Sequence, residues 1–168
     1  MTDLKQFVVA VPDFPQPGIL FRDIMPLLKA QFEPTIAALE ELLTGDEWAQ
    51  VDAVAGIESR GFILGAALAL RRGKGFIPIR KQGKLPPPVT SLAYQLEYGT
   101  AVLEMQPGSG RLLLVDDVVA TGGTMTAAAE LCLRSGFKVN ALVALVDIRL
   151  VPELHWNGMA LRAALVYD

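Results

Sequence analysis

The feature of the sequence that most constrains the fold is one run of residues, LLLVDDVVATGGT, at positions 112–124. Its four consecutive apolar residues are typical of a strand that is buried on both faces of a parallel sheet. Two carboxylates, Asp116 and Asp117, follow, and we expect the strand to end at them. A turn with two glycines and two hydroxyl side chains comes next, and residues 125–133 after it are strong helix formers. The run therefore predicts a strand, a glycine loop and a helix in direct succession.

A loop of this kind can hold a phosphate group. Gly122 and Gly123 allow the backbone to approach a ligand closely, the flanking threonine hydroxyls can donate hydrogen bonds, and the helix N-terminus offers unpaired N–H groups. Two carboxylates would repel a phosphate, but they are suited to accept hydrogen bonds from the vicinal hydroxyls of a ribose. The combination favours a sugar phosphate as the ligand. A strand end and a turn without any ligand is the alternative that the residues alone leave open.

The segment VDDVVATGGT resembles the phosphoribosyl pyrophosphate signature of the type I phosphoribosyltransferases. The resemblance implies an α/β fold of that family, with a mostly parallel, doubly wound sheet flanked by helices, a small N-terminal hood and a flexible active-site loop. It also implies that the ribose and the 5′-phosphate of this substrate are bound by Asp116, Asp117, Ala120, Thr121, Gly122, Gly123 and Thr124.

Length and composition bound the class of protein. A chain of 168 residues is expected to form one domain, covering residues 1–168. An apolar content of 52% and a charged content of 20% are typical of a globular protein, and no apolar run reaches the length of about 18 residues that spans a bilayer. The N-terminus lacks the features of a signal peptide, so a cytoplasmic location is expected. The net charge of −3 gives no general attraction to nucleic acid.

The N-terminal segment VPDFPQPGILFRDI, at residues 11–24, combines prolines with aromatic and basic side chains. Its prolines exclude a helix or a central strand and predict an ordered, extended loop. An aromatic ring and a guanidinium in a stiff loop suit a planar ligand, but a surface arm that packs its aromatic rings on the core is an equal alternative. The segment resembles the N-terminal part of the adenine phosphoribosyltransferases. That resemblance implies that Phe21 stacks on the purine, that the backbone of Leu20 contacts the purine edge, and that Arg22 lies nearby.

A second strand end carries charged side chains. Residues 51–57 are expected to form a buried strand, followed by the loop ESRG at 58–61 and a helix from 62 to about 71. This is another anion-binding geometry, with an exposed ion pair of Glu58 and Arg60 as the alternative. The family resemblance implies a cis peptide bond between the first two residues of the loop. It also implies that pyrophosphate is bound by Glu58, Ser59 and Arg60.

The strand expected at residues 75–80 ends in a cluster of three cations, Arg80, Lys81 and Lys84. A solvated rim is the alternative for such a cluster. Because the carboxyl ends of parallel strands meet at one edge of a sheet, the cations are expected beside the two anion-binding loops. This position favours contact with a pyrophosphate, and the family resemblance, over IRKQGKLP, implies the same.

The segment from Leu85 to about Gly99 shows no clear periodicity. A stretch of about 15 such residues inside a compact domain is typical of a functional lid or a disordered segment. Type I phosphoribosyltransferases have a flexible loop here that closes over the site. Within it, YQLEYG matches the adenine enzymes, which implies that Glu97 is the general acid and base and that Tyr98 lies at the pyrophosphate. A solvated loop glutamate is the alternative.

The rest of the chain is expected to be mainly scaffold. Helical spacing covers residues 26–43, and we expect Pro34 to split this helix and Gly45 to end it. A helix at 124–135 and a buried strand at 139–146 follow the central run, and residues 161–167 are expected to form an edge strand.

One residue after the strand at 139–146 has an implied role in binding. Ile148 takes the place of the purine's other apolar wall by resemblance, with a core aliphatic as an equally good alternative. The hood is then expected to come from about residues 1–25 and from the segment after 147.

The resemblance implies a purine salvage enzyme that transfers the phosphoribosyl group of phosphoribosyl pyrophosphate to N9 of adenine, giving AMP and pyrophosphate. Mg²⁺ is expected as the cofactor, held mainly by the substrate and water rather than by a protein-built metal site. The expected partners are these small-molecule substrates and a second copy in a homodimer, with no nucleic acid and no membrane. Two alternatives stay open: a phosphoribosyltransferase for another base, and a non-catalytic regulatory module that binds phosphoribosyl pyrophosphate.

Overall fold

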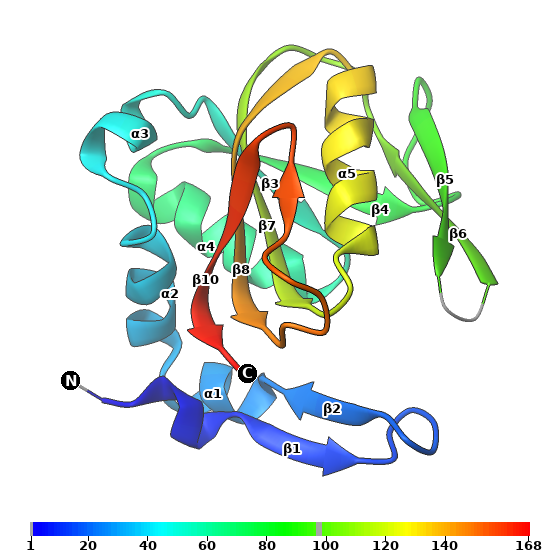
Figure 1. Cartoon of the computed structure of the whole chain (residues 1–168). Helices are drawn as coiled ribbons and strands as arrows, with labels where there is room; N and C mark the ends of the chain where they lie inside the picture. Colours follow the sequence, from blue (N-terminus) through cyan, green and yellow to red (C-terminus); the bar gives the residue numbers. More distant parts are fainter. Residues whose placement is uncertain (1, 97–98) are drawn as a thin grey trace.

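The computed structural model describes residues 2–96 and 99–168, and within them an eight-stranded sheet forms the centre of the molecule (Figure 1). The sheet places the long central strand of the sequence between parallel neighbours on both sides. In spatial order the strands are β5 (Thr90–Leu96), β6 (Gly99–Met105), β4 (Gly75–Lys81), β3 (Ala53–Ile57), β7 (Gly110–Val119), β8 (Phe137–Asp147), β10 (Met159–Val166) and β9 (His155–Trp156).

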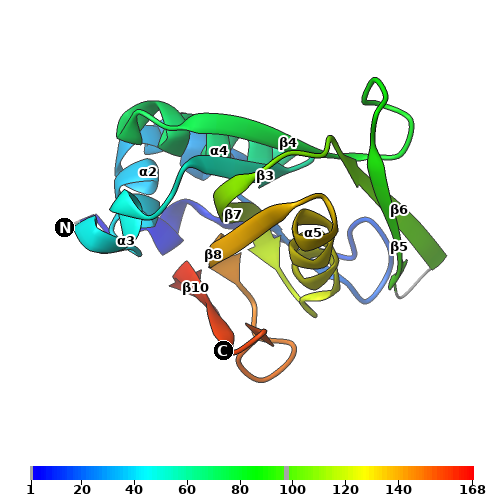
Figure 2. The same cartoon turned by 90° about the horizontal axis from the view of Figure 1, so that it is seen from above.

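The middle of the sheet is parallel, as the sequence predicts. Strands β4, β3, β7, β8 and β10 run in the same direction, whereas β5, β6 and β9 pair antiparallel at the two sides. Helix α4 (Arg60–Arg72) connects β3 to β4, and helix α5 (Gly123–Arg134) connects β7 to β8. The two helices cover opposite faces of the sheet (Figure 2). The mostly parallel, doubly wound arrangement is therefore confirmed.

Strand β7 has a core on each side. Leu113 belongs to the apolar cluster under α4, and Leu112 and Leu114 belong to the cluster under α5. This two-sided burial explains the uninterrupted apolar run. The predicted end of the strand is wrong, because β7 continues through the two aspartates to Val119. Its backbone pairing with β8 also continues, up to Val119 opposite Asp147, so the carboxylates lie inside a paired strand.

The helices before β3 differ from the prediction. Helix α1 (Met25–Ala30) and helix α2 (Phe32–Glu40) break at Gln31, not at Pro34. Pro34 lies in the first turn of α2, where no backbone N–H is needed for a helical hydrogen bond. Gly45 does not end this helix either, since it begins α3 (Gly45–Ala49), which is capped by Thr44.

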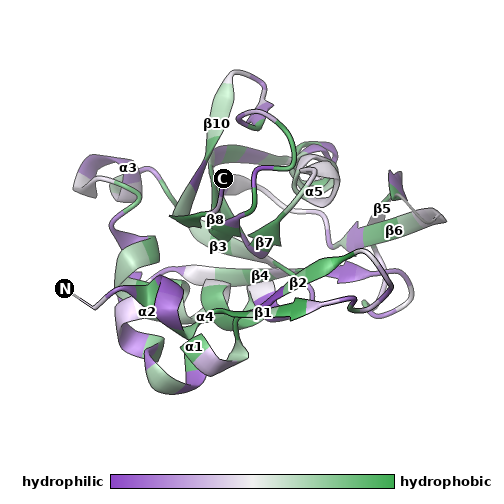
Figure 3. Cartoon of the chain, turned by 60° about the horizontal axis from the view of Figure 1, so that its bottom comes forward, coloured by the Kyte–Doolittle hydropathy of each residue, from purple (hydrophilic) through white to green (hydrophobic). Residues whose placement is uncertain are grey.

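The segment predicted to be an extended loop at residues 11–24 contains parts of two strands. A short 3₁₀ helix, η1 (Leu4–Phe7), precedes β1 (Val9–Pro12) and β2 (Leu20–Asp23), which form a separate antiparallel pair. The prolines that suggested a loop lie at the end of β1 and in the turn, where a missing N–H breaks no ladder. Figures 1 and 3 show this hairpin beyond the ends of β7 and β8, with apolar residues along it.

Two predictions at the sides of the sheet are also wrong in part. Residues 85–89 are irregular, but β5 is a regular strand paired with β6. Its Leu92 and Tyr94 are half-buried while Ala93 is exposed, an alternation that the short apolar run conceals. Strand β10 is not at the edge, because β9 pairs with it on its free side. None of the helices described combines the length and the apolar character needed to cross a membrane.

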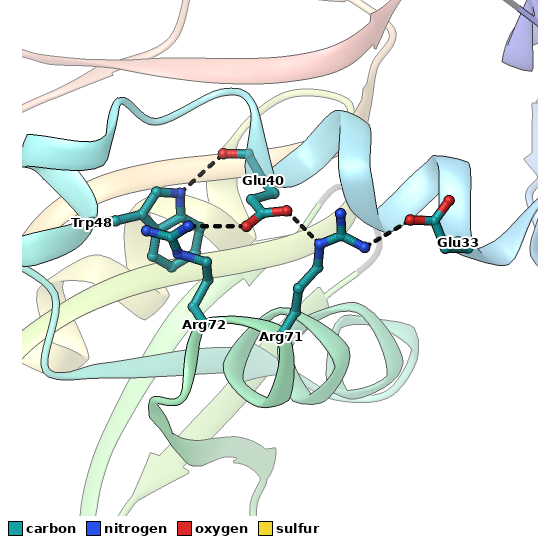
Figure 4. A network of polar contacts seen from close by, with 5 residues as sticks. All are labelled: Glu33, Glu40, Trp48, Arg71 and Arg72. Atoms are coloured by element: carbon teal, nitrogen blue, oxygen red, sulfur yellow. Dashed lines mark hydrogen bonds and ion pairs between the residues drawn. The ribbon is translucent and has the colours of Figure 1, made fainter.

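A charge network fastens α2 to α4 on the side of the sheet remote from α5 (Figure 4). Both carboxylate oxygens of Glu40 are paired, one with Arg71 and the other with Arg72 at 3.1 Å. Arg71 also reaches Glu33 at 2.7 Å, and the indole N–H of Trp48 donates to the backbone carbonyl of Glu40 at 3.0 Å. Burial by itself raises the pKa of Glu40, but the hydrogen bonds from the two arginines outweigh it and hold the pKa below its usual value. Glu40 is thus the centre of the polar contact between these helices.

We expect Glu40→Gln to lower the free energy of unfolding by about 1–3 kcal/mol at neutral pH, because it removes a half-buried carboxylate with two charge-assisted hydrogen bonds. Since the folded pKa is lowered, the contribution of Glu40 is present above its unfolded pKa and is lost as the pH falls through the folded value. The difference between wild type and variant in urea unfolding should therefore shrink in acid.

Glu33→Gln is the matched control for this prediction. The side chain of Glu33 is 71% exposed, against 19% for Glu40, so its loss should change the stability by no more than about 0.5 kcal/mol. An equal loss in the two variants would contradict a special role for Glu40.

Candidate active site

A cavity of about 770 Å³ opens where the ends of β7, β8 and β10 face the N-terminal hairpin. Such a volume suits a small-molecule site. Its lining combines an apolar side with a polar loop and a helix start, so a ligand with an apolar part and a charged part fits it. The lining residues are 17–20, 22, 96, 116, 118–125, 148, 150, 167 and 168.

The polar side of the cavity is the loop between β7 and α5. Gly122 takes a left-handed φ of 86° immediately before the helix, a conformation that favours glycine. A Cβ atom there would lie 2.7 Å from Cδ1 of Leu154, so close packing adds a second reason for glycine. Thr121 and Thr124 flank the two glycines, and no described side chain caps the helix. The first N–H groups of α5 therefore face the cavity as an anion-binding end.

The acidic pair lies beside this loop. Asp116 lines the cavity although its residue is only 7% exposed, and it accepts a hydrogen bond from the backbone N–H of Asp117 at 2.9 Å. Burial, and then the neighbouring charge of Asp117, raise the pKa of Asp116 well above its usual value. Asp117 forms an ion pair with Arg60, with Nε and Oδ2 2.7 Å apart. One of the two carboxylates therefore has a cationic partner and the other faces the cavity.

Arg60 connects the acidic pair with the N-terminal hairpin. Its guanidinium lies 5.2 Å from the centre of the Phe21 ring, which in turn meets Phe14 edge to face at 5.1 Å. Among the described residues that line the cavity, Leu20 and Arg22 are present and Phe21 is not. The stacking of Phe21 on a ligand stays a prediction.

The opposite apolar wall includes Ile148, which lines the cavity and whose backbone N–H donates to the carbonyl of Val119 at 3.0 Å. The lining residues outside the motifs that the sequence singled out are Leu150, Tyr167 and Asp168, and sequence reasoning named none of them individually. A signal for the last two was present: they directly follow β10, which runs parallel to β8, so the end of β10 reaches the same edge of the sheet.

A second group of charges lies at the ends of β3 and β4. The Glu58 side chain is 5% exposed and accepts hydrogen bonds from Nε of Arg80 at 2.9 Å and from Nζ of Lys84 at 3.2 Å. Burial raises the pKa of Glu58, but the hydrogen bonds from the two cations outweigh it and leave the pKa lowered. We call the two cations Arg80 and Lys84, together with the Glu58 carboxylate that binds both, the cation cluster. The alternative for this loop, an exposed ion pair of Glu58 and Arg60, is not formed, since Arg60 contacts Asp117 instead.

Other predicted residues are placed around this cluster. Lys81 donates its backbone N–H to Oε2 of Glu58 at 3.4 Å, and Ser59 is the residue before α4. The Glu58–Ser59 peptide bond is cis, which confirms the expectation from the family resemblance. Glu97 and Tyr98, predicted to be the acid/base and a pyrophosphate contact, lie outside the described residues. Their neighbour Leu96 lines the cavity.

Within residues 2–96 and 99–168, no group of three or more His, Cys, Asp or Glu side chains could hold a metal ion. Mg²⁺ commonly binds through one or two carboxylates together with substrate phosphates and water. Asp116 supplies a hard oxygen ligand of that kind at the cavity. The residues present therefore fit an ion that is shared with a phosphorylated ligand.

Comparison with protein families and known proteins gives a consistent result. Residues 28–154 match the phosphoribosyl transferase domain family. The chain is 49% identical to the adenine phosphoribosyltransferase of Hydrogenovibrio crunogenus, over 98% of this chain and 96% of the relative.

Two solved structures show the same fold. The adenine phosphoribosyltransferase of Rhodothermus marinus is 41% identical, with a TM-score of 0.84 over 97% of this chain and 96% of the other. The adenine phosphoribosyltransferase of Saccharomyces cerevisiae, solved with D-2,5-dideoxy-2,5-imino-altritol 1,6-bisphosphate and adenine, is 32% identical, with a TM-score of 0.85 over 96% of each chain.

The environment of Asp116 leads to a prediction about stability. Asp116→Asn should raise the melting temperature at neutral pH by about 2–4 °C, close to 1 kcal/mol, because it removes the cost of a buried charge beside a like charge. With a raised folded pKa, the folded protein holds a proton that the unfolded chain releases, so this cost grows as the pH rises above about 4. The gain measured by calorimetry should grow over the same range.

Asp117→Asn is the matched control, since Asp117 has the cationic partner Arg60. The loss of this pair should leave the melting temperature unchanged or lower it. A gain in stability for Asp117→Asn and none for Asp116→Asn would contradict this assignment of the charges.

Proposed function

The chain belongs to the adenine phosphoribosyltransferase family, and we propose that its cavity and its cation cluster bind the two substrates of that reaction, adenine and phosphoribosyl pyrophosphate. The enzyme transfers the phosphoribosyl group to N9 of adenine and releases pyrophosphate, which yields AMP and serves purine salvage. The observation that carries the proposal is the buried Asp116 at the cavity, beside the glycine loop and the start of α5. This combination offers acceptors to ribose hydroxyls and donors to the 5′-phosphate.

The ribose 5-phosphate part is assigned to the loop after β7. Asp116 and Asp117 accept hydrogen bonds from the two ribose hydroxyls. The 5′-phosphate accepts hydrogen bonds from the backbone and hydroxyl groups of the loop and the first turn of α5. The residues in this role are Ala120, Thr121, Gly122, Gly123 and Thr124.

Pyrophosphate is assigned to the cation cluster and its surroundings. Glu58 does not itself attract an anion; its buried carboxylate orients Arg80 and Lys84 before the substrate binds. Cations that are already fixed lose less conformational entropy on binding. Ser59, Arg60, Lys81 and Tyr98 complete the proposed set.

Adenine is assigned to the apolar part of the cavity, under a hood formed by the N-terminal hairpin and the segment after residue 147. Leu20 of the N-terminal hairpin and Ile148 after β8 both line this part. The backbone of Leu20 is proposed to contact the purine edge, with Arg22 nearby and Phe21 stacking on the ring.

Mg²⁺ is proposed to enter with phosphoribosyl pyrophosphate, held mainly by substrate oxygens and water, with the Asp116 carboxylate at the cavity as an available oxygen ligand. When bound, the ion neutralises negative charge on the departing pyrophosphate. The protein's own cations, Arg80 and Lys84, act on the same charge.

Glu97 is proposed to be the general acid and base. Adenine with its proton on N7 has a free lone pair at N9, and it becomes cationic as the bond from N9 to C1′ of the ribose forms. A carboxylate hydrogen-bonded to the N7 proton stabilises this charge and accepts the proton. In the reverse direction the carboxylic acid protonates the leaving purine.

We propose a single domain, a cytoplasmic location and a homodimer, in keeping with family membership. Light scattering on the purified protein tests the dimer directly.

We expect AMP to form when the protein is mixed with phosphoribosyl pyrophosphate, Mg²⁺ and adenine. In a competition assay with guanine, xanthine, hypoxanthine and orotate, adenine should be the preferred base, because the cavity belongs to an adenine-specific family. Preference for another base would reassign the substrate, and binding of phosphoribosyl pyrophosphate without nucleotide formation would indicate a regulatory module.

Glu97→Gln should lower kcat in a single-turnover assay by roughly 10²–10⁴, the usual contribution of a positioned acid or base. The affinity for phosphoribosyl pyrophosphate should stay within about twofold, since its proposed contacts lie elsewhere. A single-turnover format is needed because slow product release could mask the chemical step. A wild-type rate in this assay would remove the role from Glu97.

A further inference from the structure

Glu104, in β6, is a buried acidic residue that the proposed reaction does not use. It is only 6% exposed, and it forms no ion pair with any described residue. A buried carboxylate without a cation is costly unless hydrogen bonds compensate it. Two do so here: the N–H of Gly83 donates to Oε2 at 3.1 Å, and the hydroxyl of Ser91 donates to Oε1 at 3.2 Å.

The first of these contacts holds the turn that carries the cation cluster. Gly83 lies between Lys81 and Lys84, with a left-handed φ of 84°. The adjacent N–H of Gln82 donates to the carbonyl of Val102 in β6 at 3.1 Å. Strand β6 therefore holds two successive N–H groups of this turn, one through its backbone and one through the Glu104 side chain.

The second contact attaches the same carboxylate to the neighbouring strand. Ser91 lies directly opposite Glu104 in the antiparallel pair of β5 and β6, and Arg80 lies opposite Glu104 on the other side, in the pair of β4 and β6. Glu104 thus stands where three strands meet. Its side chain joins the end of β4 to β5, so it fixes the path of the chain between Arg80 and Lys84.

The cation cluster is consequently held from two directions. Glu58 pairs with the side chains of Arg80 and Lys84, and Glu104 holds the backbone between them. A charged acceptor forms a stronger hydrogen bond to an N–H than a neutral one does, which suits the restraint of a left-handed turn. The position of the Lys84 ammonium depends on the orientation of the preceding Gly83 peptide.

We propose that Glu104 is a positioning residue for pyrophosphate, which acts by fixing the turn at residues 82–84 and never touches the substrate. The proposal rests on the assignment of pyrophosphate to the cation cluster. A residue that only stabilises the fold would affect both ends of the site when it is replaced. Loss of Glu104 should instead affect the pyrophosphate end and spare the AMP end.

The test measures the Kd of inorganic pyrophosphate with Mg²⁺ and the Kd of AMP for each variant, together with the KM for phosphoribosyl pyrophosphate and for adenine. Glu104→Met removes both hydrogen bonds and keeps a side chain of similar length. It should raise the pyrophosphate Kd and the KM for phosphoribosyl pyrophosphate about tenfold, the effect of one lost charge-assisted hydrogen bond. The AMP Kd and the KM for adenine should stay within about twofold.

Two further variants separate positioning from folding. Glu104→Gln can still accept from Gly83 and can donate its amide N–H to Ser91, so it should restore the pyrophosphate Kd to within about threefold of wild type. Glu104→Asp keeps the buried charge but is shorter by one methylene, so it should weaken pyrophosphate binding several-fold. The Asp variant decides the matter if the Met variant does not fold. Equal losses for pyrophosphate and AMP, or no loss for pyrophosphate, would overturn the proposal.

Lys84→Met in the same assay distinguishes the positioning role of Glu104 from the assignment of pyrophosphate to the cation cluster, on which that role rests. Weaker pyrophosphate binding for Lys84→Met, with no change for Glu104→Met and Glu104→Asp, would overturn the positioning role alone. Unchanged binding for Lys84→Met would remove pyrophosphate from the cation cluster and overturn both proposals.

Discussion

The parallel pairing of β7 on both of its edges is the constraint on which the rest of the structure depends. Because β3 and β8 flank it in the same direction, and β4 and β10 continue the pattern, five strand ends arrive at one edge of the sheet. Residues as distant in sequence as Arg60, Asp117 and Ile148 are thereby brought to one region. The loops that follow the parallel strands lie at this edge, and they present backbone N–H groups or side chains beyond the end of the sheet. The polar site is a consequence of this topology.

Charge balance is the second constraint at this edge. Acidic side chains buried so close together would repel one another and destabilise the fold, and the structure compensates most of them with cations. Asp117 has Arg60, and Glu58 has Arg80 and Lys84, whereas Asp116 forms no ion pair with a described residue and lies beside the negative charge of Asp117. The group with the least compensation is also the one that faces the cavity. This distribution is typical of a functional site, where binding is favoured at the expense of stability.

The sequence predicts the parallel strands, the two crossover helices and the loops at the strand ends, because each of these has a strong local signal. The apolar run before Asp116 and the glycines at 122 and 123 are of this kind. What could not be predicted depends on pairing with distant residues. Whether β7 ends at its aspartates is decided by the register with β8, and the regular strand β5 exists because β6 returns beside it.

The candidate site divides in the same way. The residues that could be named carry chemistry in short motifs, such as the aspartates and the cations after β4. The ion pair of Arg60 with Asp117 could not be named, since nothing in either loop indicates which neighbour the guanidinium selects. Leu150 and Tyr167 were not named individually, because an apolar or aromatic side chain after a strand carries no chemistry of its own. Their place at the cavity follows from the parallel pairing of β8 and β10.

Helix α4 links the stability of the fold with the geometry of the site. Arg60 is its first residue and lies at the acidic pair, while Arg71 and Arg72 form its last turn and bind Glu40. A helix of 13 residues is about 20 Å long, so its two ends lie far apart. The side between them is packed, with Leu64 and Leu68 fully buried against the sheet. The helix is therefore held by the Glu40 network at its last turn, by apolar packing along one face and by the ion pair of Arg60 with Asp117 at its first residue.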